Sequence, residues 1–301
     1  MHTATEKKIA PPDKTTHEAT DFGQVKRPAR ALLGWMQRDQ AHKIQAGQQT
    51  NVHLPEHEEH ATRARMSVAA RPVGVDQSNV ISEAPVELRE HIAALQKAPA
   101  ATQYFQQGWR VCLADLRTVC ALQPQIFTDD AVERTRGLQP GDLRGIAAIS
   151  LPLPRAASLP ILFDEARQSW ILSSANPNLR VVGNWNAEIQ PGILGVGFGV
   201  SVMPSFVQVV RFSNRYVLRD GYHRAYGFLR AGISTVPVLT REFEPFEDLG
   251  LPAGLLPPAA YLGDRPPLLT DFLNDDVSAD VLLPATQKMI VVAGLELTTL
   301  G

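Results

Sequence analysis

The sequence predicts an α+β protein, with a small mixed β-sheet and packed helices that follow a polar N-terminal region. Two observations predict this class. Residues 207–239 read as strand, tight turn, helix and strand. Residues 1–84 are polar and contain few large apolar side chains, whereas apolar residues are frequent afterwards. We therefore expect residues 1–84 to be largely disordered, with one short helix near Ala31–Met36, and residues 85–301 to form the domain.

The clearest elements lie between residues 206 and 239. Strands are predicted over 206–210 and 216–219, joined by a hairpin turn at Ser213-Asn214. Apolar residues at helical spacing predict a helix over 222–231, and residues 235–239 predict a further strand. Phe228 and Leu229 continue the apolar stripe of the helix, so we expect the sheet to bury them.

The rest of the predicted domain has weaker signals. Apolar spacing predicts a helix over 85–95, and acidic residues at a helix start predict another over 129–134. Strands are expected over 109–116 with an extension over 119–122, over 170–172 and over 179–182. The chain after Leu239 is rich in proline and leucine, and we expect it to form a C-terminal extension of the domain.

The turn before the central helix carries the strongest functional signal. Asp220-Gly221 is a turn pair in which glycine can take a positive φ, and His223 and Arg224 fall in the first helical turn. A helix N-terminus offers free backbone NH groups and a partial positive charge, so an anion site is predicted there, with phosphate as its ligand. Arg224 would hold phosphate oxygens through its planar fork, and His223 would donate a hydrogen bond or a proton.

The same residues also have a purely structural interpretation. His223 and Arg224 can cap the strand end and pair with neighbouring carboxylates, and Asp220 can stabilise the turn. The functional interpretation makes two testable statements. Gly221, His223 and Arg224 line one concave pocket, in which Tyr222 contacts the part of the ligand beside the phosphate. Asp220 orients His223 or Arg224, or helps to hold Mg²⁺.

The run Asp220-Gly221-Tyr222-His223-Arg224, followed by a helix containing Ala and Leu, a glycine and a Val-Pro-Val strand, resembles the signature segment of the ParB-like and sulfiredoxin-like superfold. The resemblance covers residues 207–239 and implies that this turn grips the phosphates of a bound nucleotide. Sulfiredoxins have a catalytic cysteine where this chain has Tyr222, so their reductase chemistry is not expected. The prolines after Leu239 leave little room for the helix-turn-helix domain of partition proteins.

Three functions are consistent with this resemblance. The first is a nucleotide-dependent hydrolase or phosphotransferase that uses a nucleoside triphosphate and Mg²⁺, with His223 and Asp220 as catalytic candidates. The second is a non-catalytic module switched by a nucleotide or a phosphorylated small molecule, with the polar N-terminal region as a tether. The third is a ParB-like nuclease or DNA-binding protein, which the near-neutral charge disfavours.

Composition narrows the expected binding partners and cellular location. The formal net charge is −2 and the sequence isoelectric point is about 6.5, which gives no general attraction to nucleic acid or acidic membranes. No apolar run reaches the roughly 18 residues of a membrane helix. The first residues contain no apolar signal core, so a cytoplasmic location is expected. Cys112 and Cys120 are expected to be buried thiols rather than a disulfide pair.

Three further clusters have a functional and a structural interpretation. Residues 192–199 contain four glycines and can form a ligand loop, although a glycine-rich strand or lid is favoured. His53, His57 and His60 have a spacing that suits a metal, but their polar surroundings favour a solvated segment. Acidic surface residues are likewise favoured over an ion site for Asp271, Asp275, Asp276 and Asp280.

Overall fold

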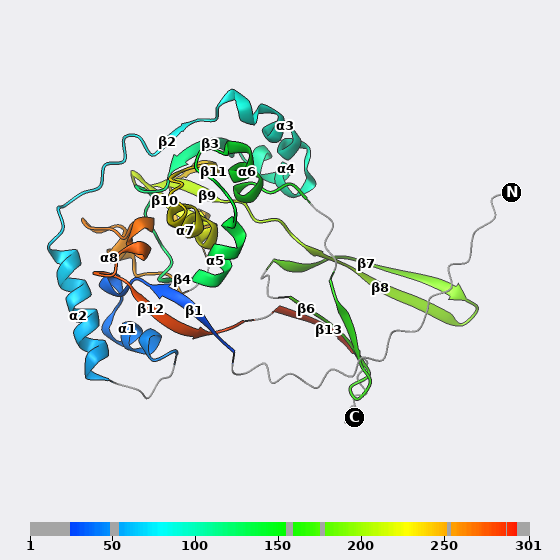
Figure 1. Ribbon diagram of the computed structural model, residues 1–301. Helices are drawn as coiled ribbons and strands as arrows, with labels where there is room; N and C mark the ends of the chain where they lie inside the picture. The colour runs from blue at the N-terminus through cyan, green and yellow to red at the C-terminus, as the bar shows by residue number, and fades with distance from the viewer. Residues whose placement is uncertain are drawn as a thin grey trace.

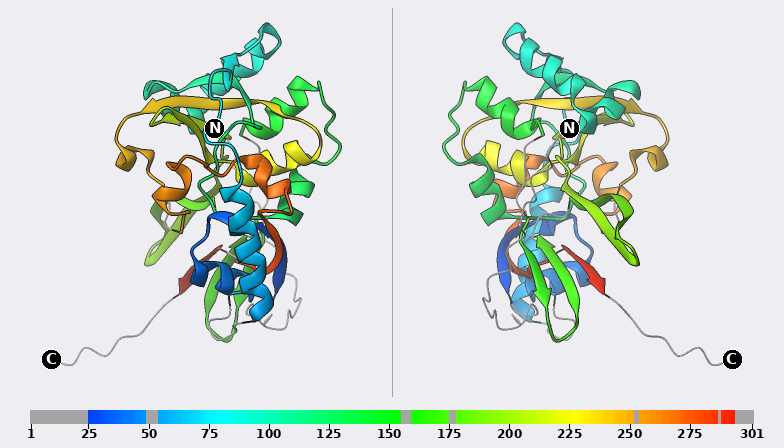
Figure 2. Two further views of the ribbon diagram at one scale, coloured as in Figure 1. Left: turned by 90° about the vertical axis from the view of Figure 1, so that its left-hand side faces the viewer. Right: turned by 90° about the vertical axis from the view of Figure 1, so that its right-hand side faces the viewer.

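The computed structural model describes residues 25–48, 54–154, 159–174, 178–251, 254–286 and 288–293. Within these residues the protein is α+β, as the sequence predicts, and its strands form four sheets of two to five strands. Figures 1 and 2 show a compact body with helices α1 and α2 at one side and two β-hairpins that leave it at the opposite side.

The body is built on a five-stranded mixed sheet in the order β10-β9-β11-β3-β2. Strand β11 runs parallel to β9, and the other neighbours are antiparallel. The three strands predicted around the turn are therefore confirmed as members of one mixed sheet. The strands are β2 (Ile81–Glu83), β3 (Arg110–Asp115), β9 (Gln208–Phe212), β10 (Arg215–Asp220) and β11 (Thr235–Phe243).

Helix α7 (Tyr222–Arg230) begins directly after β10, as the sequence predicts. It packs against α5 (Thr128–Thr135), and α6 (Leu143–Ser150) packs against β11. The α5–α7 contact is close, because a Cβ at Gly227 would lie 2.5 Å from the carbonyl oxygen of Ala131. Phe228 is fully buried, which confirms its expected position, and Leu229 is partly buried against the same core.

A second sheet contradicts the predicted disorder for the described part of the N-terminal region, whereas residues 1–24 lie outside the described residues. Strand β1 (Lys26–Ala31) is the middle strand of a three-stranded sheet, between β12 (Ala279–Pro284) and β4 (Gln125–Phe127). Both neighbours are antiparallel to it. The next residues form a short 3₁₀ turn (Leu33–Trp35) in place of the expected helix, and Leu33 is fully buried. The expected boundary at residue 84 therefore does not separate disordered from folded chain.

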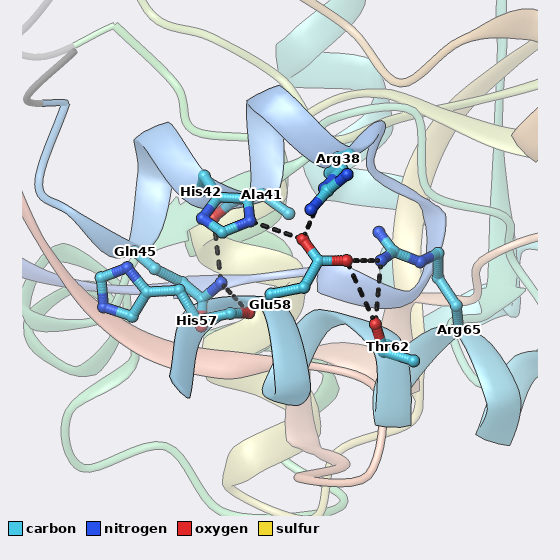
Figure 3. A network of polar contacts seen from close by, with 8 residues as sticks. All are labelled: Arg38, Ala41, His42, Gln45, His57, Glu58, Thr62 and Arg65. Carbon is cyan, nitrogen blue, oxygen red and sulfur yellow. Dashed lines mark hydrogen bonds and ion pairs between the residues drawn. The ribbon is translucent and has the colours of Figure 1, made fainter. Parts of the chain in front are cut away.

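Two helices follow within the same N-terminal region. Helix α1 (Arg38–Gln45) and helix α2 (Pro55–Ala69) are joined through the Glu58 carboxylate, which accepts hydrogen bonds from Arg38 Nε at 2.8 Å and His42 Nε2 at 2.6 Å (Figure 3). Arg65 Nη2 donates to the other carboxylate oxygen at 3.2 Å. Hydrogen bonds from His42 and Arg38 lower the pKa of Glu58 to about 2. Polar contacts between α1 and α2 thus stabilise a segment whose sequence shows little apolar pattern.

The remaining elements surround this core. The predicted helix over 85–95 is a 3₁₀ turn (Val86–Leu88) followed by α3 (Arg89–Lys97), and α4 (Pro99–Gln106) comes next. Strands β5 (Ile161–Asp164), β6 (Ser169–Ser174) and β13 (Lys288–Ala293) form a small sheet. After β11 the chain forms two 3₁₀ turns, Phe246–Leu249 and Leu269–Leu273, and α8 (Pro258–Tyr261) between them. Every described helix is too short or too polar to cross a bilayer.

The structure also decides several smaller expectations. Cys112 and Cys120 are buried free thiols, as expected. Residues 193–202 form a strand, so the glycine-rich segment is a strand as favoured. The expected extension over 119–122 is absent as a strand, since Cys120 makes only isolated bridges. Asp271 is not a surface residue: it is buried and receives Arg71 Nη2 at 2.7 Å.

Candidate functional site

The turn between β10 and α7 depends on Gly221. Its φ is 98°, in the left-handed region that favours glycine, and a Cβ there would lie 2.8 Å from Val207 Cγ2. Asp220 Oδ1 accepts a hydrogen bond from the Gly221 backbone NH at 2.6 Å. Asp220 therefore stabilises the turn, as its structural interpretation proposed.

Tyr222 points into the protein. Its hydroxyl accepts a hydrogen bond from the Leu122 backbone NH at 2.7 Å and donates one to the Leu218 carbonyl at 2.6 Å. The ring is buried, and this burial raises the pKa of Tyr222. The side chain ties the strand before the turn to a segment about 100 residues earlier, so it is a structural residue in this position.

Arg224 is also turned inward, which contradicts the expectation that its side chain faces a cavity. Nη1 donates to the carbonyl oxygens of Ser205 at 2.6 Å and Ile149 at 3.2 Å, and Nη2 donates to Ser205 Oγ at 3.1 Å. Burial lowers the pKa of Arg224 to about 10. Since protein oxygens already receive the guanidinium donors, Arg224 fastens α7 to the end of α6 and to the chain before β9.

His223 lies against α5 rather than over an open cleft. Its ring is stacked on Phe127, with centroids 6.0 Å apart and planes 8° apart, and Nε2 has no hydrogen-bond partner among the described residues. Burial lowers the pKa of His223 to about 4. The imidazole is therefore neutral at pH 7 and contributes no positive charge to an anion site. Among the described residues, no group of three metal-ligating side chains surrounds Asp220 or any other position.

A cleft opens beside this turn, at Arg219. Its volume is about 460 Å³, and it lies among α4, the start of β3, the ends of β10 and β11, and the 3₁₀ turn at residues 246–249. Its lining combines aromatic rings with polar and charged side chains. The lining residues are Gln103, Tyr104, Gln107, Trp109, Arg219, Arg241, Phe243 and Asp248.

The side chain of Arg219 is directed by an irregularity of its strand. Leu218 pairs with Val209 and Asp220 with Gln208, so Arg219 is the extra residue of a β-bulge. Its Nε donates to the Leu249 carbonyl at 2.5 Å, and its Nη1 donates to Gln208 Oε1. Its Cζ lies 5.6 Å from the Trp109 ring centroid. The guanidinium is thus held at the cleft by contacts on two sides.

Arg241 supplies the second positive charge. Its Cζ lies 4.8 Å from the Phe243 ring centroid. Within the described part of the chain, no hydrogen bond or ion pair engages its guanidinium. Among the described residues Asp248 is the one carboxylate that lines the cleft, so the three charged side chains leave a net positive charge there. Two arginines beside aromatic rings suit a ligand that carries both negative charge and a flat apolar group.

Neither a protein-family model, a curated protein nor a solved structure matches the chain. Sequence reasoning selected residues 220–224 and missed Arg219, which directly precedes them, and Arg241, which lies at the end of β11. The bulge that turns Arg219 outward has no mark in the sequence, and Arg241 joins the site only because β9 brings β10 and β11 together.

Proposed function

We propose that this protein binds a nucleotide or a related phosphorylated small molecule in the Arg219–Arg241 cleft. The observation that carries the proposal is the pair of arginines from two strands of one sheet, facing a cleft that also contains Trp109. We further infer that the unit from β9 to β11 belongs to the ParB-like and sulfiredoxin-like superfold. Its support is the order of strand, glycine turn, helix and strand around Gly221.

The phosphate part of the ligand would lie between the guanidinium groups. Arginine recognises phosphate through two parallel hydrogen bonds, and these are stronger than bonds between neutral groups. Arg241 is the better donor, because no described residue occupies its guanidinium. This arrangement does not use the start of α7, because the side chains of His223 and Arg224 there are directed into the protein.

The base of a nucleotide would lie on the aromatic part of the lining. The Trp109 ring makes edge contacts with Tyr104 at 5.6 Å and Phe243 at 5.7 Å between centroids, so these rings form one apolar wall. Gln103 and Gln107 supply donors and acceptors for the edge of a base. A volume of about 460 Å³ falls within the range of small-molecule sites.

A magnesium ion would be held by Asp248 together with the phosphates, rather than by Asp220. Magnesium is usually bound through one or two carboxylates and substrate phosphates, and Asp248 is the carboxylate that lines the cleft. Asp220 is engaged by the Gly221 NH instead. The proposal covers binding alone, as in a nucleotide-switched module, because the geometry of the cleft does not point to a particular reaction.

Calorimetry with ATP, CTP, GTP and inorganic phosphate, each with and without Mg²⁺, tests the proposal. Arg241→Ala should weaken nucleotide binding by ~1.5 to 3 kcal/mol, roughly 10- to 150-fold in Kd, because a charged hydrogen-bond donor is lost. Arg241→Lys should restore part of the affinity, since the charge remains without the fork.

The matched control is Arg211→Ala. Arg211 lies on the neighbouring strand β9 and pairs with Glu242 at 3.3 Å, outside the cleft lining. This variant should bind nucleotide like the wild type. Equal affinity of Arg241→Ala and wild type for every ligand tested, or no binding by the wild type, would reject the cleft as the site.

A further inference from the structure

The second unusual feature of the molecule is the hairpin of β7 (Leu179–Gln190) and β8 (Ile193–Val202), which we call the arm. These two strands pair with each other and form a sheet of their own within the described chain. Figure 1 shows the arm extending away from the body, on the side opposite α2. Isolated two-stranded ribbons are at best marginally stable in water, so an arm of this length needs a further contact.

The arm exposes large apolar side chains. On β8, Leu194, Val196 and Phe198 are 66%, 61% and 46% exposed, and they alternate with glycines along the strand. All three therefore point to the same face. The glycines point to the other face, where Trp185 of β7 covers Gly197 closely enough to leave no room for a Cβ.

The two edges of the arm differ. Strand β7 has two register shifts, between Val181 and Gly183 and between Glu188 and Gln190, and it carries the charges of Arg180 and Glu188. Bulges and charges are the devices that protect an edge strand from pairing. Strand β8 contains no charged residue and no proline. Among the described residues no strand pairs with its outer edge, which is therefore open to another strand.

We propose that the arm is a self-association surface, in which β8 pairs antiparallel with β8 of a second copy of this chain across a two-fold axis. In an antiparallel pair, directly opposite residues lie on the same face of the sheet. The two-fold register centred on Val196 therefore places Leu194, Val196 and Phe198 beside the same three residues of the second copy, and Gly195 beside Gly197. The four strands then form one continuous sheet.

Charge and surface area both favour a second copy as the occupant. Residues 179–202 contain one basic and one acidic side chain, so two arms do not repel each other, and the arm holds no basic cluster for nucleic acid or acidic lipid. Eight large apolar side chains of the arm are about half exposed or more. The four on β8, namely Ile193, Leu194, Val196 and Phe198, lie beside the paired edge, and their burial adds to the backbone hydrogen bonds of the β8–β8 pair.

Sedimentation velocity of the full chain over a dilution series tests the proposal. The wild type should be a dimer that dissociates on dilution. The double variant Val196→Lys/Phe198→Lys places like charges opposite each other and should raise the dimer Kd on the order of a hundredfold. Val196→Glu/Phe198→Glu should have the same effect. An equimolar mixture of the two variants should form a dimer again, because opposite charges now face each other.

The matched control is Met66→Lys/Val86→Lys, which adds the same charge at exposed apolar positions of the body. It should sediment like the wild type. Recovery of the dimer on mixing also shows that both charged variants are folded. The proposal is overturned if the wild type is monomeric throughout, if the Lys variant remains a dimer, or if the mixture stays monomeric. Binding of monomeric wild type to neutral phosphatidylcholine vesicles through the arm would likewise overturn it.

Discussion

Gly221 is the residue on which the start of α7 depends, for two separate reasons. Its φ of 98° is unfavourable for residues with a Cβ, and the space beside it is filled by Val207. Tyr222 and Arg224 then direct their polar groups into the protein, where each forms bonds of 2.6 Å. At the scale of single residues, the turn is therefore a packing junction that positions Arg219 at the cleft.

Replacing Gly221 by alanine should destabilise the protein by about 2 to 4 kcal/mol. The left-handed backbone costs about 1 to 2 kcal/mol and the contact with Val207 adds a similar amount. Chemical denaturation measures the change. Gly232→Ala is the control, because its φ is 75° but no atom lies within 4 Å of the added Cβ. Equal losses of stability for the two variants would show that the contact with Val207 does not contribute to the free energy of unfolding.

His223 should make stability depend on pH. Its pKa is lowered to about 4 by burial, whereas the unfolded chain has a pKa near the ordinary 6.5. The unfolded state therefore binds more protons between these values. Stability is complete above pH 6.5, decreases by roughly 2 to 3 kcal/mol as the pH falls towards 4, and levels off below it.

The comparison of wild type with His223→Gln isolates this effect. Denaturant midpoints measured from pH 4 to 7 should fall less steeply in the variant. The window lies above that of Glu58, whose lowered pKa of about 2 acts between pH 4.5 and 2. Burial also lowers the pKa of His60, but that contribution is common to both proteins. Parallel pH curves would contradict the assignment.

At the scale of elements, the α1–α2 pair depends on one carboxylate. Glu58 accepts hydrogen bonds from Arg38 and His42 on α1 and from Arg65 on its own helix (Figure 3). Glu58→Gln keeps the shape and removes the charge, so it should lower the thermal midpoint. Glu59→Gln is the matched control, since Glu59 is exposed and its contact with Arg63 is 3.9 Å long. Equal midpoints would contradict this role.

Elements with local signals were predicted well from the sequence. Strands β9, β10 and β11 and helix α7 have apolar patterns and turn residues within about 35 residues, and the structure confirms them. Strand β1 was missed because it buries Ala29 and Ala31, whose small side chains give little apolar pattern. Arg30 of the same strand is also buried, although an arginine at this position predicts an exposed surface site. Neither the partners of β1 nor the bulge at Arg219 leaves a local signal.

At the scale of the whole molecule, contacts between distant parts of the chain hold the body together. Strand β1 pairs with β12, about 250 residues later, and with β4, about 100 residues later. Arg30 Nε donates to the Phe272 carbonyl at 2.9 Å, and Arg71 pairs with Asp271 at 2.7 Å. The hydrophobic core likewise includes residues from both ends of the described chain. We therefore expect folding to depend on the described part of the N-terminal region.

A chain that begins at Pro85 should therefore fail to fold. It lacks the middle strand of the β12-β1-β4 sheet, it leaves that sheet's two outer strands unpaired, and it removes Leu32 and Leu33 from the core. The near-UV circular dichroism of this fragment should be lost, together with a cooperative thermal transition. In the full chain, Leu33→Asp should have the same effect, whereas Leu54→Asp, at an exposed position, should not. A fragment from Pro85 with native near-UV circular dichroism would mean that the domain is stable without the N-terminal strand and helices.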